Sequence, residues 1–269
     1  MLDMVVIGGG PAGLSAAISA RQRNNTVTVL SNDIASSGLY KASIVDNYPG
    51  YPGISGSMLL EKLVSHAKVV DVNMVTGRVQ SALQAGNAIH ISCENEVFSA
   101  KCLVLATGIT QTSLFHGEEE FLGRGVSYCA TCDGMLYRGK RVCAICLTQD
   151  GEDEADYLSS IGCDVVRINS HNVEITGDTR VASIIVDGEE IECSGVFIMR
   201  PAIAPHLLMR GLETHNGYIG ANASGETNIA GVFAAGDCVG KPHQIAKAIG
   251  QGQVAALSAS EFIMKRNGE

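Results

Sequence analysis

The stretch DMVVIGGGPAGLSAAISARQR, residues 3–23, joins a short apolar run, a cluster of glycines and a longer alanine-rich run. This order predicts a strand, a tight turn and a helix, and TVTVL at residues 26–30 predicts the next strand. A strand-helix-strand unit with such a turn is typical of a doubly wound fold. We therefore expect an α/β protein.

The glycines of this turn, Gly8, Gly10 and Gly13, form the pattern G-x-G-x-x-G between the predicted strand and helix. They permit a tight turn and let a pyrophosphate approach the helix N-terminus, where free N–H groups and the dipole favour anions. In this context the motif predicts dinucleotide binding. Asp33 lies 20 residues after Gly13 and is either an acid that binds a ribose hydroxyl or a solvated loop acid.

The composition limits the possible classes of function. The chain has 269 residues, 31 glycines, no tryptophan and a net charge of −9, which fits one large or two modest α/β domains. The negative charge argues against nucleic acid and anionic membranes as partners. No run approaches the roughly 18 apolar residues of a membrane span, and Asp3 stands where a signal peptide would be basic. We expect a soluble, cytoplasmic protein whose ligands are small molecules or proteins.

The end of the chain favours FAD over NAD as the dinucleotide. GVFAAGD, residues 231–237, predicts a buried strand that delivers the carboxylate of Asp237, a group suited to hydroxyls such as those of a ribityl chain. HQI at residues 243–245 then opens a long helix, about 244–265, whose N-terminus could stabilise negative charge on a reduced isoalloxazine. Taken alone, Asp237 could equally be a helix cap.

The segment YCATCDG, residues 128–134, carries the sharpest chemical signal. Cys129 and Cys132 are separated by two residues, so they can close a small ring and cycle between dithiol and disulfide. Asp133 could exchange protons with a thiolate, or it could be a surface acid in a turn. Nine cysteines without a secretion signal also favour a redox or metal role for some of them over a disulfide scaffold.

Cys143 and Cys146 offer an alternative, because with the first pair they complete C-x2-C-x10-C-x2-C, a spacing that a structural zinc site could use. Both lie in a strand-like run, where residues three apart point to opposite faces. They cannot easily share a metal ion there. We predict buried core cysteines and no metal site.

A second strand-helix-strand start lies at residues 141–168, with strands at 141–146 and 164–168 and a helix at about 153–161. Its turn contains only Gly151, and no lysine or arginine lies between Arg141 and Arg167. The acids in this interval are Asp150, Glu152, Asp153, Glu154, Asp156 and Asp164. They can cap the helix, and each would repel a nearby phosphate by about 1 kcal/mol or more.

Five segments, GGGPAG, VDNYPG, ATG, GVSYCATCDG and GVFAAGD, occur in an order that resembles the low-molecular-weight thioredoxin reductase family over nearly the whole chain. The resemblance implies an α/β fold with two Rossmann-like, three-layer domains. Residues 1–109 and 212–269 would form a discontinuous FAD-binding domain. Residues 110–211 would form an inserted domain, a degenerate NADPH-type fold that carries the redox disulfide. The family usually forms homodimers.

The resemblance also implies roles for individual residues. Cys132 would face the flavin, Cys129 would attack the disulfide of the partner protein, and Asp133 would be the acid. The pyrophosphate would lie against the first glycine turn. The expected FAD contacts are Gly8, Gly10, Pro11, Ala12, Gly13, Ser31, Gly38, Leu39, Asn47, Val79, Ala106, Thr107, Gly108, Gly236, Asp237, Gln244 and Ile245.

One part of the chain departs from the family pattern. Members that use NADPH carry a second glycine-rich turn after the first strand of the inserted domain and a basic cluster after its second strand. This chain has Cys146, Leu147 and Thr148 in place of the glycines, and NSHN at residues 169–172 in place of the basic cluster. We expect NADPH binding in the family's manner to be lost. A branch of the family without this site takes electrons from reduced ferredoxin, and the chain looks like that branch.

The resulting hypothesis is a flavoprotein that reduces thioredoxin, or a similar protein, through FAD and the pair Cys129 and Cys132. Its electrons would come from reduced ferredoxin or, as a second candidate, from a deazaflavin. Ferredoxins are usually acidic, so docking would need a local basic patch. Candidates for this patch are Arg138, Lys140 and Arg141, or Lys241 and Lys247.

Three alternative functions remain open from the sequence. A dithiol oxidase would use the same FAD and cysteine pair in reverse and pass electrons to oxygen. An NADPH-dependent thioredoxin reductase would need an atypical nucleotide site. A non-catalytic module, with or without bound zinc, would contain no flavin.

Overall fold

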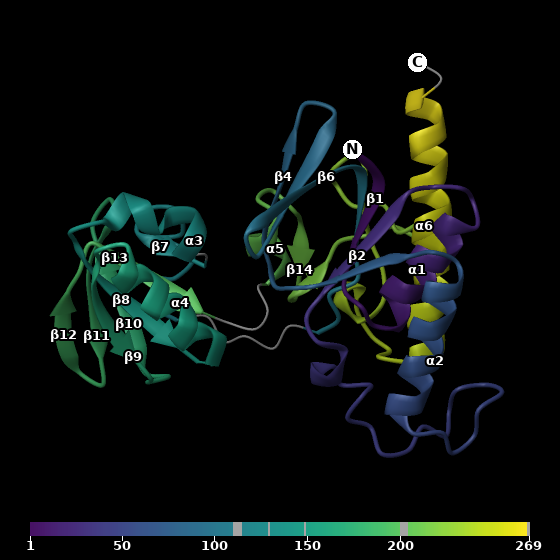
Figure 1. Cartoon of the computed structure of the whole chain (residues 1–269), viewed down its shortest axis with the longest axis horizontal. Helices are drawn as coiled ribbons and strands as arrows, with labels where there is room; N and C mark the ends of the chain where they lie inside the picture. The colour runs from purple at the N-terminus through teal and green to yellow at the C-terminus, as the bar shows by residue number, and fades with distance from the viewer. Residues whose placement is uncertain (110–114, 129, 148, 200–203, 268–269) are drawn as a thin grey trace. The chain divides into compact units, whose positions relative to one another are not determined.

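The chain divides into two compact units in the computed structural model, which describes residues 1–109, 115–128, 130–147, 149–199 and 204–267 (Figure 1). Unit 1 consists of Met1–Thr110 and Ala204–Glu269, and unit 2 of Gln111–Ile203. Each unit has its own sheet with parallel strands. The predicted α/β class with two Rossmann-like units is confirmed. The domain limits predicted from the sequence, 1–109 with 212–269 and 110–211, stay a prediction.

Unit 1 is built on a seven-stranded sheet of order β3-β2-β1-β6-β5-β4, with β16 also paired to β6. The strands β1, β2, β3, β6 and β16 run parallel, and β4 and β5 add an antiparallel meander. The strands are β1 (Leu2–Ile7), β2 (Val27–Ser31), β3 (Asn73–Thr76), β4 (Val79–Ala85), β5 (Ala88–Cys93), β6 (Glu96–Leu105) and β16 (Val232–Ala234). A separate two-stranded ladder joins β14 (Thr214–His215) and β15 (Tyr218–Ile219).

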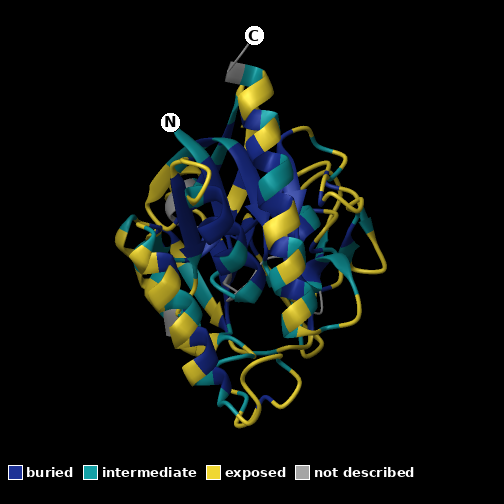
Figure 2. Cartoon of the chain, turned by 90° about the vertical axis from the view of Figure 1, so that its right-hand side faces the viewer, coloured by how far each residue is buried: buried dark blue, intermediate teal, exposed yellow. Residues whose placement is uncertain are grey.

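Helices cover the sheet of unit 1. They are α1 (Pro11–Arg21), α2 (Gly56–Val69), α5 (Pro205–Leu208) and α6 (Ile245–Asn267), with 3-10 turns η1 (Ile34–Ser36) and η3 (Asp237–Val239). Small buried side chains such as Ala16, Ala17, Ala255 and Ala259 let α1 and α6 pack closely against each other and the sheet. Figure 2 shows the buried strands behind the helix that ends at the C-terminus. None of the helices in the described ranges has the length and hydropathy that crossing a bilayer requires.

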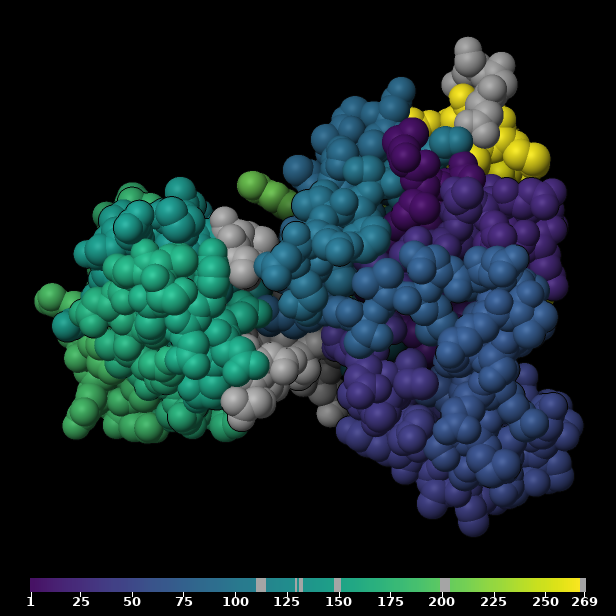
Figure 3. All heavy atoms as spheres, viewed as in Figure 1, coloured from purple at the N-terminus to yellow at the C-terminus, as the bar shows by residue number. Residues whose placement is uncertain are grey.

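The face of unit 1 drawn in Figure 3 is formed mainly by the first hundred residues, coloured purple to blue. It includes α2 and the loop that precedes it. Hydrogen bonds from Val45 N to Ile54 O (2.8 Å) and from Gly56 N to Ala42 O (2.8 Å) close this loop. The loop therefore carries the predicted site residue Asn47 on a backbone tied at both ends.

Unit 2 contains a four-stranded parallel sheet of order β7-β13-β8-β9 and an antiparallel meander of β10, β11 and β12. Its strands are β7 (Val126–Ser127), β8 (Arg141–Cys146), β9 (Asp164–Ile168), β10 (Val173–Gly177), β11 (Val181–Val186), β12 (Glu189–Glu192) and β13 (Gly195–Met199). Its helices are α3 (Ala130–Asp133) and α4 (Gln149–Ser160), with the 3-10 turn η2 (Gly134–Tyr137). The predicted strands at 141–146 and 164–168 are confirmed. The helix begins at Gln149, four residues before its predicted start.

A polar contact at the start of the chain fastens three strands of unit 1 together. Asp3 Oδ1 accepts a hydrogen bond from Lys101 Nζ (2.8 Å), and Asp3 Oδ2 accepts from the backbone N–H and the hydroxyl of Thr26 (both 2.9 Å). Burial opposes ionisation of Asp3, but these hydrogen bonds outweigh it, so the pKa of its carboxyl is lowered. The contact therefore joins β1, β6 and the residue before β2 most strongly when Asp3 is ionised.

Replacing Asp3 by asparagine tests this contact. Because the pKa of Asp3 is lower in the folded state, its contribution is present above the unfolded-state value and is lost as pH falls through the folded value. Asp3→Asn should lower the free energy of unfolding at pH 7 by about 1 kcal/mol, and its difference from wild type should shrink below about pH 4. Urea unfolding at several pH values measures this, with the exposed Glu61→Gln as control. Equal stability of Asp3→Asn and wild type at pH 7 would contradict the assignment.

Candidate active site

The glycine turn between β1 and α1 is held by contacts that exclude side chains. Gly8 has a φ of +118°, and a Cβ there would lie 2.1 Å from the carbonyl oxygen of Ala106. A Cβ on Gly13 would lie 1.8 Å from the carbonyl oxygen of Gly8. Strand, turn and helix can therefore come this close only because these two residues lack side chains.

The same turn is open on one side. A Cβ on Gly10 would meet no atom of the described chain within 4 Å. Gly10 is the N-cap of α1, no side chain caps the helix there, and its first turn contains no acid. The first N–H groups of α1 can therefore bind an anion such as a pyrophosphate. The predicted residues Pro11 and Ala12 are the first two of this helix.

The carboxylate of Asp237 lies in the segment that follows β16. Oδ1 of Asp237 is buried and has no hydrogen-bond partner among the described residues. Oγ1 of Thr107, also buried, has no such partner among the described residues apart from a weak interaction with the thiol of Cys238. Buried polar atoms of this kind are costly unless a ligand satisfies them. The side chains of Asp237 and Thr107 suit the hydroxyl groups of an FAD molecule. Both residues are among the FAD contacts predicted from the sequence.

The backbone around Asp237 is fixed by α6. Gly236 N donates to Gln251 Oε1 (3.1 Å), and the ammonium group of Lys247 donates to the carbonyl oxygens of Gly236 (3.3 Å) and Gly240. Gly236 has a φ of +88°, a conformation that other residues rarely adopt. From the sequence, Lys247 was a candidate only for a basic surface patch. Its hydrogen bonds with the loop that carries Asp237 were not predicted.

Two further predicted residues that are far apart in the chain meet directly. Asn47 Nδ2 donates to Gln244 Oε1 (2.7 Å), which links the loop before α2 to the residue preceding α6. The neighbouring Tyr218 hydroxyl lies 3.3 Å from His243 Nε2. The structure therefore brings the loop before α2 to the N-terminus of α6. The predicted residue Ile245 is the first residue of α6.

The remaining predicted FAD contacts are spread along the edges of β2, β4 and β6. Ser31 ends β2, Gly38 and Leu39 follow η1, and Val79 begins β4. Ala106 and Gly108 flank Thr107 directly after β6. Their contact with FAD stays a prediction.

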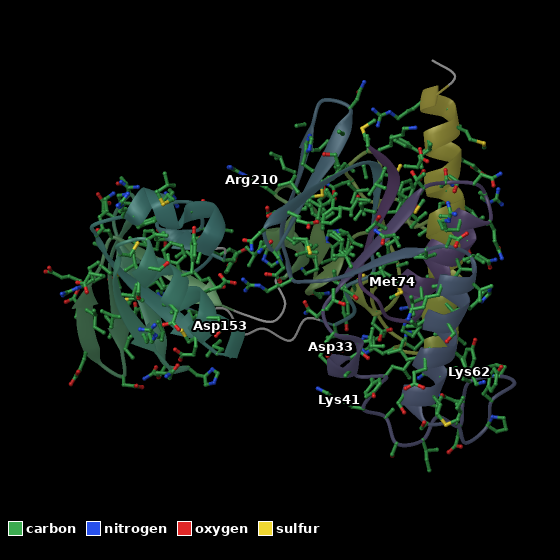
Figure 4. The ribbon with its side chains drawn as sticks, viewed as in Figure 1. Asp33, Lys41, Lys62, Met74, Asp153 and Arg210 are labelled. Carbon is green, nitrogen blue, oxygen red and sulfur yellow. The ribbon has the colours of Figure 1, made fainter. Side chains whose placement is uncertain are left out.

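Asp33, which is labelled in Figure 4, has a local role. Its Oδ1 accepts a hydrogen bond from Ala35 N (2.9 Å) and caps η1. Its side chain is exposed. This favours the loop-acid interpretation over ribose binding.

The redox motif is described in part. Cys129 lies outside the described residues, and Cys132 lies in α3, while its side chain is not among those described. Asp133, the last residue of α3, accepts a hydrogen bond from the Ser127 hydroxyl at Oδ2 (2.6 Å). Burial, with Asp133 nearby, raises the pKa of Tyr137. Asp133 is therefore a positioned carboxylate next to Cys132, which suits the predicted proton exchange.

An acid of α4 contacts the redox helix. Glu154 Oε2 accepts a hydrogen bond from the backbone N–H of Ala130 (3.1 Å), the first residue of α3. From the sequence, Glu154 was expected only to cap its own helix and to repel a phosphate. Nothing in the local sequence pattern connects residues 24 positions apart, so this contact could not be predicted.

Two other acids of α4 are neutralised by an arginine from β9. Arg167 Nε lies 3.1 Å from Glu152 Oε2, and its Nη2 forms an ion pair with Asp156. The sequence between Arg141 and Arg167 therefore suggests more negative charge at this site than the structure has, because Arg167 itself lies against two of the acids. The group of Arg167, Glu152 and Asp156 still carries a net charge of −1. The guanidinium of Arg167 is already paired with these carboxylates.

The turn after β8 is filled by its own side chain. The thiol of Cys146 is buried and donates to the carbonyl oxygens of Gly151 (3.3 Å) and Ala144 (3.6 Å). Burial first, and then Glu152, raises the pKa of this thiol to about 11, so it is un-ionised at neutral pH. Thr148, which follows in the same turn, lies outside the described residues. The Cys146 sulfur therefore occupies space beside the backbone of this turn that would be empty if residue 146 were a glycine.

The open side of the glycine turn between β1 and α1 can be tested by a glycine substitution. Because nothing in the chain lies near the Cβ position of Gly10, Gly10→Ala should fold normally. Its methyl group would project into the space proposed for the pyrophosphate and should lower FAD content several-fold. Absorbance at the flavin band measures FAD, and circular dichroism checks folding. Full FAD content in Gly10→Ala would contradict the placement.

Gly8→Ala serves as the comparison. Its Cβ would clash with Ala106 and needs a strained backbone, so it should lose about 1 to 3 kcal/mol of folding stability, unlike Gly10→Ala. Thermal unfolding of both apo variants separates the two effects.

Comparisons with known proteins agree with this geometry. The chain matches the family described as "Pyridine nucleotide-disulphide oxidoreductase" over residues 2–168 and 155–252. It is 32% identical to a 34.2 kDa protein in the rubredoxin operon of Clostridium pasteurianum, over 97% of each chain. It is 27% identical to the thioredoxin reductase of Bacillus subtilis, over 97% of this chain and 94% of the relative.

Among solved structures, the chain resembles a ferredoxin-flavin thioredoxin reductase from Clostridium acetobutylicum, with 37% identity, a TM-score of 0.86 and coverage of 97% of each chain. An atypical thioredoxin reductase from Desulfovibrio vulgaris Hildenborough gives 26% identity and a TM-score of 0.74, over 98% and 99% of the two chains. These matches confirm the family and the FAD cofactor predicted from the sequence. The chain belongs to the pyridine nucleotide-disulphide oxidoreductase family and is a thioredoxin reductase-like FAD protein.

Proposed function

We propose that the chain reduces thioredoxin through the disulfide of Cys129 and Cys132, with electrons from reduced ferredoxin and not from NADPH. The observation that carries this proposal is the turn after β8. Its interior holds the Cys146 thiol, bonded to Gly151 O, where a nucleotide-binding turn needs bare backbone. The likeness to the ferredoxin-flavin enzyme of Clostridium acetobutylicum supports the choice of donor.

The electrostatics of α4 also support the loss of NADPH binding. Glu152, Asp153 and Glu154 lie in the first half of the helix, close to where a pyrophosphate would lie. Each carboxylate within a few ångströms costs a phosphate about 1 kcal/mol or more. Arg167 of β9 pairs with Glu152 and Asp156, so its guanidinium is already engaged with carboxylates and is not available to a phosphate.

The residues of the chain divide the reaction between them. FAD, when bound, supplies a carrier that takes electrons singly and releases them in pairs. Two electrons and two protons convert the disulfide of Cys129 and Cys132 to a dithiol. The Cys129 thiolate attacks the thioredoxin disulfide, and Cys132 then displaces reduced thioredoxin and restores the original disulfide. Asp133, oriented by Ser127, exchanges the proton of Cys132.

Fewer basic side chains are available to bind an acidic ferredoxin than the sequence indicated. Arg141 Nε bonds to Asp164 Oδ2 (2.7 Å), and Lys247 is engaged with backbone carbonyls. The candidates that stay are Arg138 and Lys140 in unit 2 or, as the alternative, Lys241 in unit 1; all three are exposed, although Lys140 Nζ also donates to Leu136 O (3.2 Å). We also propose a homodimer, which the resemblance to thioredoxin reductases supports.

An anaerobic titration tests the donor. NADPH, NADH and reduced ferredoxin are each added to the purified, FAD-loaded protein while the flavin absorbance is followed. Reduced ferredoxin should bleach the flavin within the mixing time, and neither nucleotide should do so. Cys132→Ser should bleach equally but should not reduce thioredoxin, which separates flavin reduction from the dithiol step.

Each alternative has its own outcome in this titration. Prompt bleaching by NADPH would favour a reductase with an atypical site and end the proposed donor. A reduced deazaflavin that bleaches the flavin when ferredoxin does not would replace ferredoxin as donor. Rapid peroxide formation from a small dithiol in air would favour a dithiol oxidase.

The contact between Glu154 and α3 gives a second test. A carboxylate beside the helix start disfavours thiolate formation in the redox pair, whereas a glutamine keeps the acceptor and removes the charge. Glu154→Gln should therefore lower the apparent pKa for alkylation of the reduced pair by roughly half a unit. Iodoacetamide labelling rates against pH, read by mass spectrometry, measure this. Asp153→Asn, an exposed neighbour labelled in Figure 4, should leave the profile unchanged. An equal shift in both variants would contradict a specific contact.

A further inference from the structure

Unit 2 contains two cysteines, outside the redox motif, whose thiols touch. Cys143 lies in the middle of β8 and is fully buried, and Cys193 lies between β12 and β13 with 7% of its surface exposed. Both are free thiols, and their side chains are hydrogen-bonded to each other. The two sulfur atoms are therefore neighbours, although 50 residues separate them in the sequence.

The backbone holds Cys193 beside β8. Cys193 N donates to Ala182 O (3.0 Å) of β11, and Ser194 N donates to Arg141 O (2.8 Å) of β8. From Gly195 onward the chain pairs with β8 in parallel register, with Val196 opposite Cys143. Backbone hydrogen bonds to β11 and β8 therefore hold the segment that carries Cys193, and they keep its side chain close to β8.

The two thiols differ in acidity. The hydrogen bond to Cys193, together with burial, raises the pKa of Cys143. The same hydrogen bond lowers the pKa of Cys193, against the effect of burial, and the N–H groups of Gly195 and Cys143 add to this. Cys143 therefore acts as the donor and Cys193 as the sulfur that ionises first.

The other buried cysteines have a different environment. Burial raises the pKa of Cys93 and Cys238 to about 11 and that of Cys102 to about 12. Thiols of this kind are unreactive at neutral pH, because the thiolate is the nucleophile. Cys193 differs from them because it combines a thiol neighbour with stabilisation of its charge.

We propose that Cys143 and Cys193 form a second dithiol in unit 2, which hydrogen peroxide oxidises to a disulfide. The Cys193 thiolate attacks one peroxide oxygen and becomes a sulfenic acid, releasing hydroxide. The Cys143 thiol then attacks the sulfenic sulfur, the S–S bond forms and water leaves. Overall the two thiols lose two electrons and two protons, and the peroxide becomes two molecules of water.

The site is placed to affect the redox motif. Tyr137, at the end of η2, packs edge-on against Phe197 with ring centroids 5.3 Å apart. A Cβ on Gly195 would lie 2.5 Å from the Tyr137 ring, so the link from Cys193 to β13 has no free space on this side. A covalent bond at Cys193 would constrain Gly195, two residues on, which lies against Tyr137 of the turn that follows Cys132.

Thiol counting on the FAD-loaded protein tests the proposal. The protein is treated with graded hydrogen peroxide, denatured in acid, labelled with N-ethylmaleimide and digested for mass spectrometry. Beyond the pair Cys129 and Cys132, two further labels should be lost together, and a peptide linked through Cys143 and Cys193 should appear. Dithiothreitol should restore both labels.

Matched variants define the result. Cys193→Ser should retain the label on Cys143 at every dose that oxidises wild type, whereas Cys163→Ser, at another buried cysteine, should behave as wild type. The absence of the linked peptide after Cys129 and Cys132 are fully oxidised would overturn the proposal. So would an unchanged two-label loss in Cys193→Ser. If Cys193→Ser does not fold, the wild-type peptide map alone decides.

Discussion

The close approach of the Gly8 backbone to the carbonyl oxygen of Ala106 governs unit 1. It places the end of β1 next to the end of β6. It also turns the chain so that α1 begins four residues after the end of β1. Helix α1 then packs against α6, whose first turns hold the loop that presents Asp237. Residues from three distant parts of the chain thereby lie near the N-terminus of α1, where we propose that the pyrophosphate of FAD binds.

Unit 2 repeats the strand, turn and helix with the opposite outcome. Its turn contains the Cys146 thiol, its helix begins with acids, and two of these acids hold the arginine of the next strand. A third acid, Glu154, bonds to the helix of the redox motif. The acids that we propose exclude a nucleotide thus also form contacts within the unit, and Glu154 of α4 contacts the helix that contains Cys132.

Local patterns in the sequence were enough to predict the glycine turn, the strands on both sides of α4, the family and its cofactor. They worked because turn glycines, apolar runs and the C-x-x-C spacing are short-range signals. The contacts of Glu154 with Ala130, Arg167 with Glu152, and Asn47 with Gln244 join residues 15 to 197 positions apart. Such pairs depend on how the elements pack, and no local pattern encodes them. Asp33 was ambiguous for a different reason, because an acid at this position suits both a local cap and a ribose contact; its hydrogen bond with Ala35 N favours the cap.

The order of the chain in unit 1 has a consequence for its synthesis. Strands β1 to β6 precede unit 2 in the chain, but β16 and α6, which complete the core of unit 1, follow it. During translation unit 1 therefore cannot close until the ribosome has also made unit 2, β16 and α6, while unit 2, a continuous segment, is free to fold first. Until then β6 lacks its neighbour β16 and α1 lacks α6, so apolar surface of the early part of unit 1 stays exposed while the later part is made.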